Sequence, residues 1–316
     1  MKVQGYSKGP SFYVITTLMC NIQCPHCHVS AGPKLSGPPK ETIVKIAENL
    51  PQKINVLRIS GGDPLSDLGT TTSFLEALKI PPQKQIESIQ IETNGIVLSR
   101  TKEPELKELF SLLLSLGVNE IEARGTTPYH LKQALPNYNG GYRRNVANYF
   151  GSIIRKLRKL NVSFAWANVD RKIAPETSPF HGLFVYLGGQ LRDEGEAFTL
   201  PVGRAAALPS ENHGKYCLLR RDINDGEAEQ QEAGEEGIGP IITLDMTETT
   251  GRPPGMAYFC RLRRWPFGNL LERPFNFLWE NSIAAQHPII QAYEDPLFRK
   301  ALLKPGCLCP QSLSFT

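Results

Sequence analysis

The first two thirds of the chain alternate short runs rich in β-branched and aromatic residues with longer runs of helical periodicity. The short runs are predicted to be strands, and they comprise residues 11–16, 55–60, 88–93, 118–123, 162–169 and 197–202. The longer runs place apolar residues three or four positions apart, as amphipathic helices do, and they span residues 38–50, 105–116 and 144–160. Strands that alternate with helices predict right-handed βαβ units and a parallel sheet.

Six such units favour an α/β fold of the partial (β/α)6 barrel type, which we expect to form one domain over residues 10–206. In such folds the functional residues follow the carboxyl ends of the strands. Beyond this domain the alternation stops. An acidic stretch at 224–237 has no bulky apolar residue and is predicted to be a surface loop, whereas 241–251 resembles a hairpin and 267–282 a helix after a turn. We expect residues 207–316 to form a second, smaller α+β module.

Composition narrows the class of protein. The chain has 316 residues, a formal net charge of +4 and 41% hydrophobic residues, which is ordinary for a globular protein and gives no indication of nucleic-acid binding. No apolar run approaches the roughly 18 residues of a membrane span, and Met19 is not the small residue that precedes a signal cleavage site. We therefore expect a cytoplasmic protein without membrane contact, whose clustered cysteines are metal ligands or redox groups.

Three of the seven cysteines, Cys20, Cys24 and Cys27, follow the first predicted strand in the spacing C-x3-C-x2-C. A tetrahedral zinc site would need a fourth ligand, which His26 or His28 could supply. A 4Fe-4S cluster held by three thiolates would leave its fourth iron open to a ligand from outside the protein. The spacing alone leaves both interpretations open.

The context of the cysteines favours the cluster. The second predicted strand ends in SGGDP at 60–64 and the third in ETNG at 92–95. The glycine pair is expected to bring backbone close to a ligand. Each motif alone is typical of an ordinary turn. Together they place polar, glycine-containing strand ends at the same end of the predicted barrel as the cysteines.

On these residues the sequence resembles the radical S-adenosylmethionine (SAM) superfamily, and His26 stands where that family has an aromatic-type residue. The resemblance implies a 4Fe-4S cluster on the three thiolates, with SAM chelating the open iron and His26 beside the adenine. It further implies cofactor-binding roles for two groups of residues. The SAM amino group would meet Gly61, Gly62, Asp63 and Pro64; its ribose and carboxylate would meet Thr93, Asn94, Glu122 and Arg124. In this family glutamate is commoner at the position of Asp63, and an internal salt bridge is an equal interpretation of the last two residues.

The implied mechanism begins with an electron that passes from the cluster to SAM. The C5′–S bond then breaks, and the resulting 5′-deoxyadenosyl radical abstracts hydrogen from an unactivated C–H bond of the substrate. The cofactors supply this chemistry, and the barrel orients them and excludes water and oxygen.

The remaining cysteines all lie in the predicted second module: Cys217, Cys260, Cys307 and Cys309. Residues 255–282 and 200–206 resemble the cluster-binding region of SPASM and twitch enzymes within the superfamily. Four thiolates equal one ligand set, so a second 4Fe-4S cluster is implied, as in a twitch module, although the CLC spacing is tighter than usual.

Three interpretations of this quartet compete. An auxiliary cluster that accepts an electron from the substrate radical would give net oxidation. If Cys260 instead donates hydrogen to the radical, the outcome is redox-neutral epimerisation. Zinc or purely structural thiols are the third interpretation, and zinc in both cysteine sets would make the protein a non-catalytic scaffold.

The expected substrate is a peptide or an aminosugar-type small molecule. The chain begins close to its first strand, which shifts the expectation towards a small molecule. A flavodoxin- or ferredoxin-type reductant is expected as partner. The basic run at 155–160 is predicted to be the solvated face of a helix, and docking of an acidic reductant is the second interpretation of it. No P-loop, nucleophile elbow or dinucleotide fingerprint occurs, which disfavours ATPase, hydrolase and Rossmann dehydrogenase functions.

Overall fold

The computed structural model describes residues 9–25, 27, 29–124, 128–135, 137–138, 141–166, 169–188, 241–248, 252–258 and 266–284. Its strands are β1 Ser11–Thr17, β2 Lys53–Gly61, β3 Gln85–Thr93, β4 Glu120–Ala123, β5 Ser163–Trp166, β6 Asp170–Lys172, β7 Phe184–Leu187, β8 Ile241–Asp245, β9 Met256–Tyr258 and β10 Pro266–Asn269. Its helices are α1 Lys40–Asn49, α2 Leu68–Ala77, α3 Ile96–Arg100, α4 Glu103–Ser115, α5 Pro128–Ala134, α6 Tyr142–Lys159 and α8 Phe275–Ala284.

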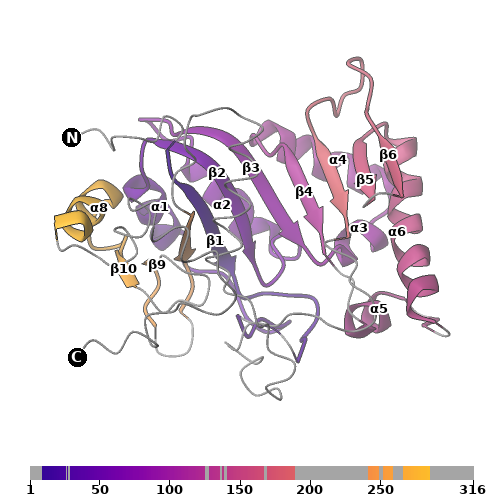
Figure 1. Cartoon of the computed structure of the whole chain (residues 1–316), viewed down its shortest axis with the longest axis horizontal. Helices are drawn as coiled ribbons and strands as arrows, with labels where there is room; N and C mark the ends of the chain where they lie inside the picture. The colour runs from indigo at the N-terminus through magenta and orange to yellow at the C-terminus, as the bar shows by residue number, and fades with distance from the viewer. Residues whose placement is uncertain are drawn as a thin grey trace, which may run out of the picture.

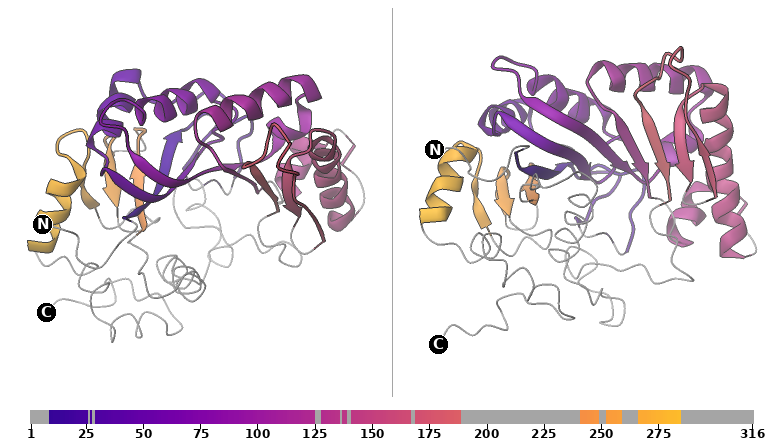
Figure 2. Two further views of the ribbon diagram at one scale, coloured as in Figure 1. Left: turned by 90° about the horizontal axis from the view of Figure 1, so that it is seen from above. Right: turned by 45° about the horizontal axis from the view of Figure 1, so that its top comes forward.

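These strands form one curved sheet in the order β10-β9-β8-β1-β2-β3-β4-β7-β5-β6 (Figure 1). Neighbouring strands from β8 to β5 are parallel, and the pairs at the two edges of the sheet are antiparallel. The helices lie along one face of the curve, as Figure 2 shows. The predicted α/β class, with a largely parallel sheet built from βα units, is confirmed for this part of the chain.

The first four predicted strands are confirmed as β1 to β4, and the three predicted helices as α1, α4 and α6. The prediction at 162–169 is wrong in its extent, because β5 ends at Trp166. After it the chain turns back, and β6 pairs antiparallel with β5. The predicted strand at 197–202, the boundary at 206 and the acidic loop at 224–237 lie outside the described residues.

Strand β7 was not predicted, and it lies between β4 and β5. It is only four residues long, FVYL, and its place depends on parallel pairing with strands far away in the sequence. Chain order therefore differs from spatial order at this edge of the sheet.

Part of the predicted C-terminal module extends the same sheet. The predicted hairpin is formed by β8 and β9, whose second strand begins later than expected, at Met256, and β8 also pairs in parallel with β1. The helix predicted after a turn within 267–282 is confirmed as α8, which follows a turn at 270–272, and the strand β10 before that turn was not predicted. The ring of Phe275 on α8 packs edge-on against that of Phe12 on β1, at 5.4 Å between centroids.

The two faces of the central strands differ in chemistry. The helix-covered face is apolar, and its residues are almost fully buried: Phe12, Val14, Leu57, Ile59, Ile91, Ile121, Val185 and Leu187. Burying one such side chain contributes roughly 1.5–3 kcal/mol, so this layer is the main source of stability. The alternate residues of β1 to β4 include tyrosine, serine, arginine and glutamate, and they face away from the helices. The apolar core therefore holds the strands in place from the helix-covered face, and the opposite face of the sheet carries polar groups.

Candidate functional site

The segments that follow β1, β2 and β3 meet at one end of the sheet, as the sequence predicts. The backbone N–H of Gly62 donates to Thr17 O at 2.7 Å, and that of Asp63 donates to Met19 O at 2.8 Å. At the next strand end, the N–H of Arg124 donates to Thr93 O at 2.8 Å. The residues picked out at four strand ends therefore form one connected region.

The glycine pair is required by contact between two loops. Gly61 has φ +129°, a conformation that side chains disfavour, and a Cβ on Gly62 would stand 2.0 Å from Met19 O. The sequence analysis assigned the pair to close approach of a ligand. The structure shows a close approach to the backbone of the segment that carries the cysteines.

The cysteines lie on a closed loop between Leu18 and Gly32. The N–H of Gly32 donates to Leu18 O at 3.0 Å, and the N–H of Cys20 donates to Gly32 O at 3.2 Å. All three cysteines are thiols; Cys20 and Cys24 are buried, and Cys27 is half-buried.

Nitrogen donors are directed at two of the sulfurs. The N–H of Ala31 donates to Cys27 Sγ at 3.3 Å, and Asn94 Nδ2 donates to Cys20 Sγ at 3.5 Å. Hydrogen bonds to sulfur are one of the ways in which proteins tune iron–sulfur clusters.

Burial raises the pKa of the Cys20 thiol to about 11, so a thiolate at this position needs a nearby positive charge such as a metal. Across the described ranges, no three His, Cys, Asp or Glu side chains are grouped as a metal site. The donor set itself, three thiols on one loop with N–H groups directed at sulfur, is chemically suited to an iron–sulfur cluster.

Asp63 holds the loops together from a fully buried position. Its Oδ1 accepts from Thr93 Oγ1 at 2.7 Å and from the N–H of Leu65 at 3.3 Å. Its Oδ2 accepts from Ser66 Oγ at 2.9 Å and from Asn21 Nδ2 at 3.5 Å. Burial raises the pKa of this carboxyl above its usual range, and the hydrogen bonds oppose that shift. The carboxylate braces the segments after β1, β2 and β3.

Asn94 connects the cysteine loop to the helices. Its Nδ2 donates to Asn21 Oδ1 at 2.8 Å as well as to Cys20, and its Oδ1 accepts from the N–H of Ile96 at 2.9 Å. Its carbonyl accepts from the buried hydroxyl of Tyr149 on α6 at 2.8 Å. Thr93 and Asn94 thus both lie in the candidate site, where their side chains position the loop.

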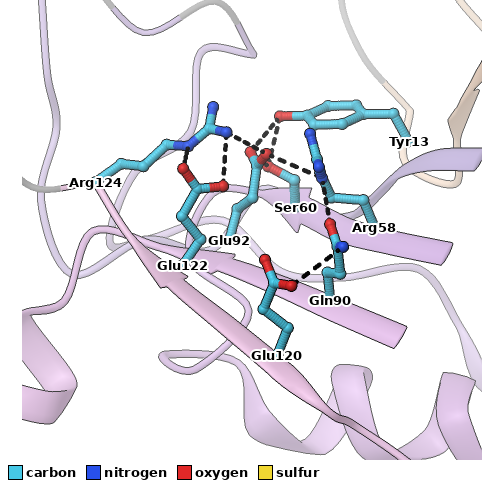
Figure 3. A network of polar contacts seen from close by, with 8 residues as sticks. All are labelled: Tyr13, Arg58, Ser60, Gln90, Glu92, Glu120, Glu122 and Arg124. Carbon is cyan, nitrogen blue, oxygen red and sulfur yellow. Dashed lines mark hydrogen bonds and ion pairs between the residues drawn. The ribbon is translucent and has the colours of Figure 1, made fainter. Parts of the chain in front are cut away.

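Glu122 and Arg124 form an ion pair with each other. The sequence offered two interpretations of these residues, contact with SAM and an internal salt bridge, and the salt bridge is present. Arg124 Nε lies 2.7 Å from Glu122 Oε1, and its NH2 donates to Glu122 Oε2 at 2.7 Å (Figure 3). Arg124 NH2 also lies 3.2 Å from Glu92 Oε1. Burial by itself would lower the pKa of Arg124, but the charges of Glu92 and Glu122 outweigh it and raise the pKa.

The pair belongs to a larger polar network that was not predicted from the sequence. It lies on the face of the sheet that none of the described helices covers, called the helix-free face below. Glu92 Oε2 accepts from Tyr13 OH at 3.0 Å and from Ser60 Oγ at 3.2 Å, and Arg58 Nε lies 3.6 Å from Glu92 Oε1. Figure 3 shows these side chains on the same side of β1 to β4. The available signal in the sequence was Glu92, a carboxylate in a predicted strand that also contains the buried Ile89 and Ile91.

His130, on α5, lies at the cysteine loop. Its Nε2 is 3.4 Å from Cys24 Sγ, and the hydroxyl of the adjacent Tyr129 donates to Gln23 O at 2.9 Å. Helix α5 therefore packs against the loop. No local pattern could have indicated this contact, because 106 positions separate the two residues.

Several predicted site residues lie outside the described residues, namely His26, Cys217, Cys260, Cys307 and Cys309. The interpretation of Cys260, as ligand or as hydrogen donor, stays a prediction. Among the helices that the structure describes, none is long and apolar enough to cross a membrane.

Residues 14–145 match the family model of the radical SAM superfamily. The matched segment contains the cysteine loop, residues 14–17 of β1, the whole of β2 to β4, and the polar network except Tyr13. No curated protein matches the sequence.

Among solved structures, the chain is similar to native anSMEcpe with bound AdoMet and Cp18Cys peptide, with 11% identity, a TM-score of 0.40, and 86% of this chain and 80% of that chain covered. It is similar to Streptococcus suis SuiB bound to precursor peptide SuiA, with 10% identity, a TM-score of 0.34, and 87% and 65% covered. It is also similar to HydG, a maturase of the FeFe-hydrogenase, with 12% identity, a TM-score of 0.32, and 76% and 57% covered.

Proposed function

We propose that the protein is a radical SAM enzyme whose Cys20, Cys24 and Cys27 hold a 4Fe-4S cluster. The observation that carries the proposal is the loop itself, which presents three thiols beside the ends of β2 and β3 within the matched domain. When bound, the cluster supplies the electron for cleavage of SAM, and the resulting 5′-deoxyadenosyl radical takes hydrogen from a C–H bond of a peptide or small-molecule substrate.

The residues of the chain contribute by position and charge. The hydrogen bonds from Ala31 and Asn94 stabilise negative charge on sulfur. Asp63 and Thr93 keep the loops after β1, β2 and β3 in register. The Gly61–Pro64 backbone at the end of β2 and the Glu122–Arg124 pair at the end of β4 are proposed to bind SAM.

For the C-terminal cysteines we propose one auxiliary 4Fe-4S cluster held by Cys217, Cys260, Cys307 and Cys309. The support is their number and the resemblance of residues 255–282 to SPASM and twitch enzymes. The cluster would accept an electron from the substrate radical and make the reaction an oxidation. A Cys260 thiol that donates hydrogen, as in an epimerase, is the alternative within the same family.

The test is anaerobic reconstitution with iron, sulfide, SAM and a flavodoxin- or ferredoxin-type reductant. We expect about eight irons per chain, two cubanes, and formation of 5′-deoxyadenosine. Replacing Cys20, Cys24 or Cys27 with alanine should abolish 5′-deoxyadenosine and remove about four irons. Replacing Cys260 with alanine should remove about four irons under the auxiliary-cluster proposal, and none if Cys260 is a donor thiol.

A zinc protein is the second candidate, and the contact between Cys24 and His130 favours it, because thiolates and imidazole together are a common zinc ligand set. Metal analysis of protein isolated without oxygen separates the two. Stoichiometric zinc, no acid-labile sulfide and no 5′-deoxyadenosine would contradict the radical SAM proposal.

A further inference from the structure

Arg58 projects from β2 onto the helix-free face of the sheet (Figure 3). Its Nε donates to Gln90 Oε1 at 2.8 Å and lies 3.6 Å from Glu92 Oε1. Within the described part of the chain this guanidinium makes no other hydrogen bond or ion pair, and the side chain is 28% exposed. Nε is thus fixed, whereas the two terminal amino groups remain available for a ligand.

The charge of Arg58 is only partly compensated. Its nearest acceptor, Gln90, is neutral. Both oxygens of Glu92 are already engaged, Oε2 with Tyr13 and Ser60 and Oε1 with Arg124 at 3.2 Å. A guanidinium usually pairs with a carboxylate through two parallel N–H···O bonds, and Arg58 lacks such a partner among the described residues.

The fold does not need an arginine at this position. On the opposite face of the same strand, Leu57 and Ile59 are fully buried and supply the packing. Partly burying a cation costs desolvation energy, and apolar residues of similar size are often as stable or more stable in such places. An oriented and undercompensated arginine in a polar network beside a cofactor site is more readily explained by ligand binding.

We propose that Arg58 binds an oxyanion of the substrate, a carboxylate or phosphate group, through its terminal amino groups. Gln90 and Glu92 act as positioning residues that fix the plane of the guanidinium. The nearby charge of Glu92 favours a singly charged group over a doubly charged one, so a carboxylate group, such as either end of glutarate, should bind more tightly than a phosphate group. This inference rests on the proposed function only in identifying the bound molecule as substrate.

The test is a calorimetric titration of the full-length, cluster-loaded protein with glutarate and, separately, with inorganic phosphate. No reductant is added, so that SAM is not consumed and binding is measured apart from turnover. The variants are Arg58→Gln, Arg58→Lys and, as matched control, Arg155→Gln, which removes an exposed arginine of α6.

We expect Arg58→Gln to weaken glutarate binding at least about tenfold, because two charge-assisted hydrogen bonds are lost. Arg58→Lys should retain part of the affinity, since it keeps the charge without the planar fork, and the control should bind as the wild type does. Tighter binding of phosphate than of glutarate, lost in Arg58→Gln, would support an anion site at Arg58 and contradict the preference for a carboxylate group.

The proposal is overturned if the wild type binds neither probe, if Arg58→Gln binds glutarate as the wild type does, or if Arg155→Gln loses as much affinity. If Arg58→Gln does not fold, the Lys variant decides, because its unchanged affinity would contradict bidentate binding. Failure of all proteins to form 5′-deoxyadenosine in a separate assay would contradict the proposed function and leave the anion result intact.

Discussion

Gly62→Ala should detach the cysteine loop from the sheet. The added methyl carbon would lie 2.0 Å from Met19 O, 2.7 Å from Met19 C and 3.0 Å from Leu18 C. Ordinary contacts to a Cβ begin near 3.4 Å, so the two backbones must separate by more than 1 Å. The obstacle is backbone on both sides, and no flexible side chain can move aside to relieve it.

The magnitude follows from what this separation breaks. The N–H of Gly62 donates to Thr17 O, and the N–H of Asp63 donates to Met19 O. Each of the two bonds contributes about 1 kcal/mol, and overpacking costs about 1–3 kcal/mol more, so we expect a loss of about 3–5 kcal/mol. For a domain of this size the melting temperature should fall by roughly 6–20 °C.

The control is Gly69→Ala in α2, where a Cβ would meet nothing within 4 Å. Because alanine has the higher helix propensity, this variant should equal the wild type or gain up to about 1 kcal/mol. Both variants are compared with the wild type by thermal melting without oxygen and by alkylation of the apo-protein with peptide mapping. Cys20 and Cys24 are buried, so release of the loop in Gly62→Ala should speed their labelling at least about tenfold. Melting and labelling of Gly62→Ala that match those of Gly69→Ala would refute the reasoning.

Three further variants test contacts around the loop. His130→Phe removes the imidazole that lies 3.4 Å from Cys24 Sγ. With Nε2 as donor to the sulfur, its loss should lower the reduction potential of the cluster by about 60 mV or less, as measured by redox titration with EPR detection. Tyr149→Phe removes the hydrogen bond to Asn94 O and should cost about 1 kcal/mol in denaturant melts. Burial raises the pKa of Tyr149, so the unfolded chain loses this proton first, and the wild type should lose stability above pH about 10 more steeply than the variant. Lys156→Met leaves three carbonyl groups of the α3 segment without their ammonium donor and should destabilise the protein by about 1–3 kcal/mol in the same melts.

For each of these variants, one result would contradict the prediction. An unchanged potential in His130→Phe would mean that the contact with Cys24 does not persist in the loaded protein. Parallel pH profiles of Tyr149→Phe and the wild type would exclude the titration of that hydroxyl as the cause of alkaline instability. Lys107→Met, which changes an exposed lysine of α4, is the control for Lys156→Met. Equal melting of the two variants would show that the hydrogen bonds from the Lys156 ammonium to the three carbonyl groups do not stabilise the protein.

The sequence predicted the elements whose signal is local. β1 to β3 have strong β-branched and aromatic runs, and α4 and α6 have helical periodicity over three turns or more. The gathering of three strand ends at the cysteine loop also followed, because parallel strands direct their carboxyl ends to one edge of the sheet. β7 and the parallel pairing of β8 with β1 could not be predicted this way, since each depends on partners far away in the chain.

Side-chain contacts between residues far apart in the sequence could not be predicted either. His130 reaches Cys24 only because α5 packs against the loop, and Tyr149 reaches Asn94 only because α6 lies behind the end of β3. Residue type still carried information at Glu122 and Arg124, where an ion pair was one of the two interpretations and is present in the structure. Their role in binding SAM stays a prediction.

The polar network could have been recognised from the strands themselves. Strands of a parallel sheet that are covered on both faces read as nearly continuous apolar runs. In β2 and β3, by contrast, Arg58, Ser60 and Glu92 alternate with isoleucines and leucines that are fully buried on the helix side. Buried, mutually paired charges such as these are costly to cover with apolar side chains. The alternation therefore indicates a face that bounds a polar site, and Arg58, the member of the network with the least compensated charge, is where a ligand should be sought first.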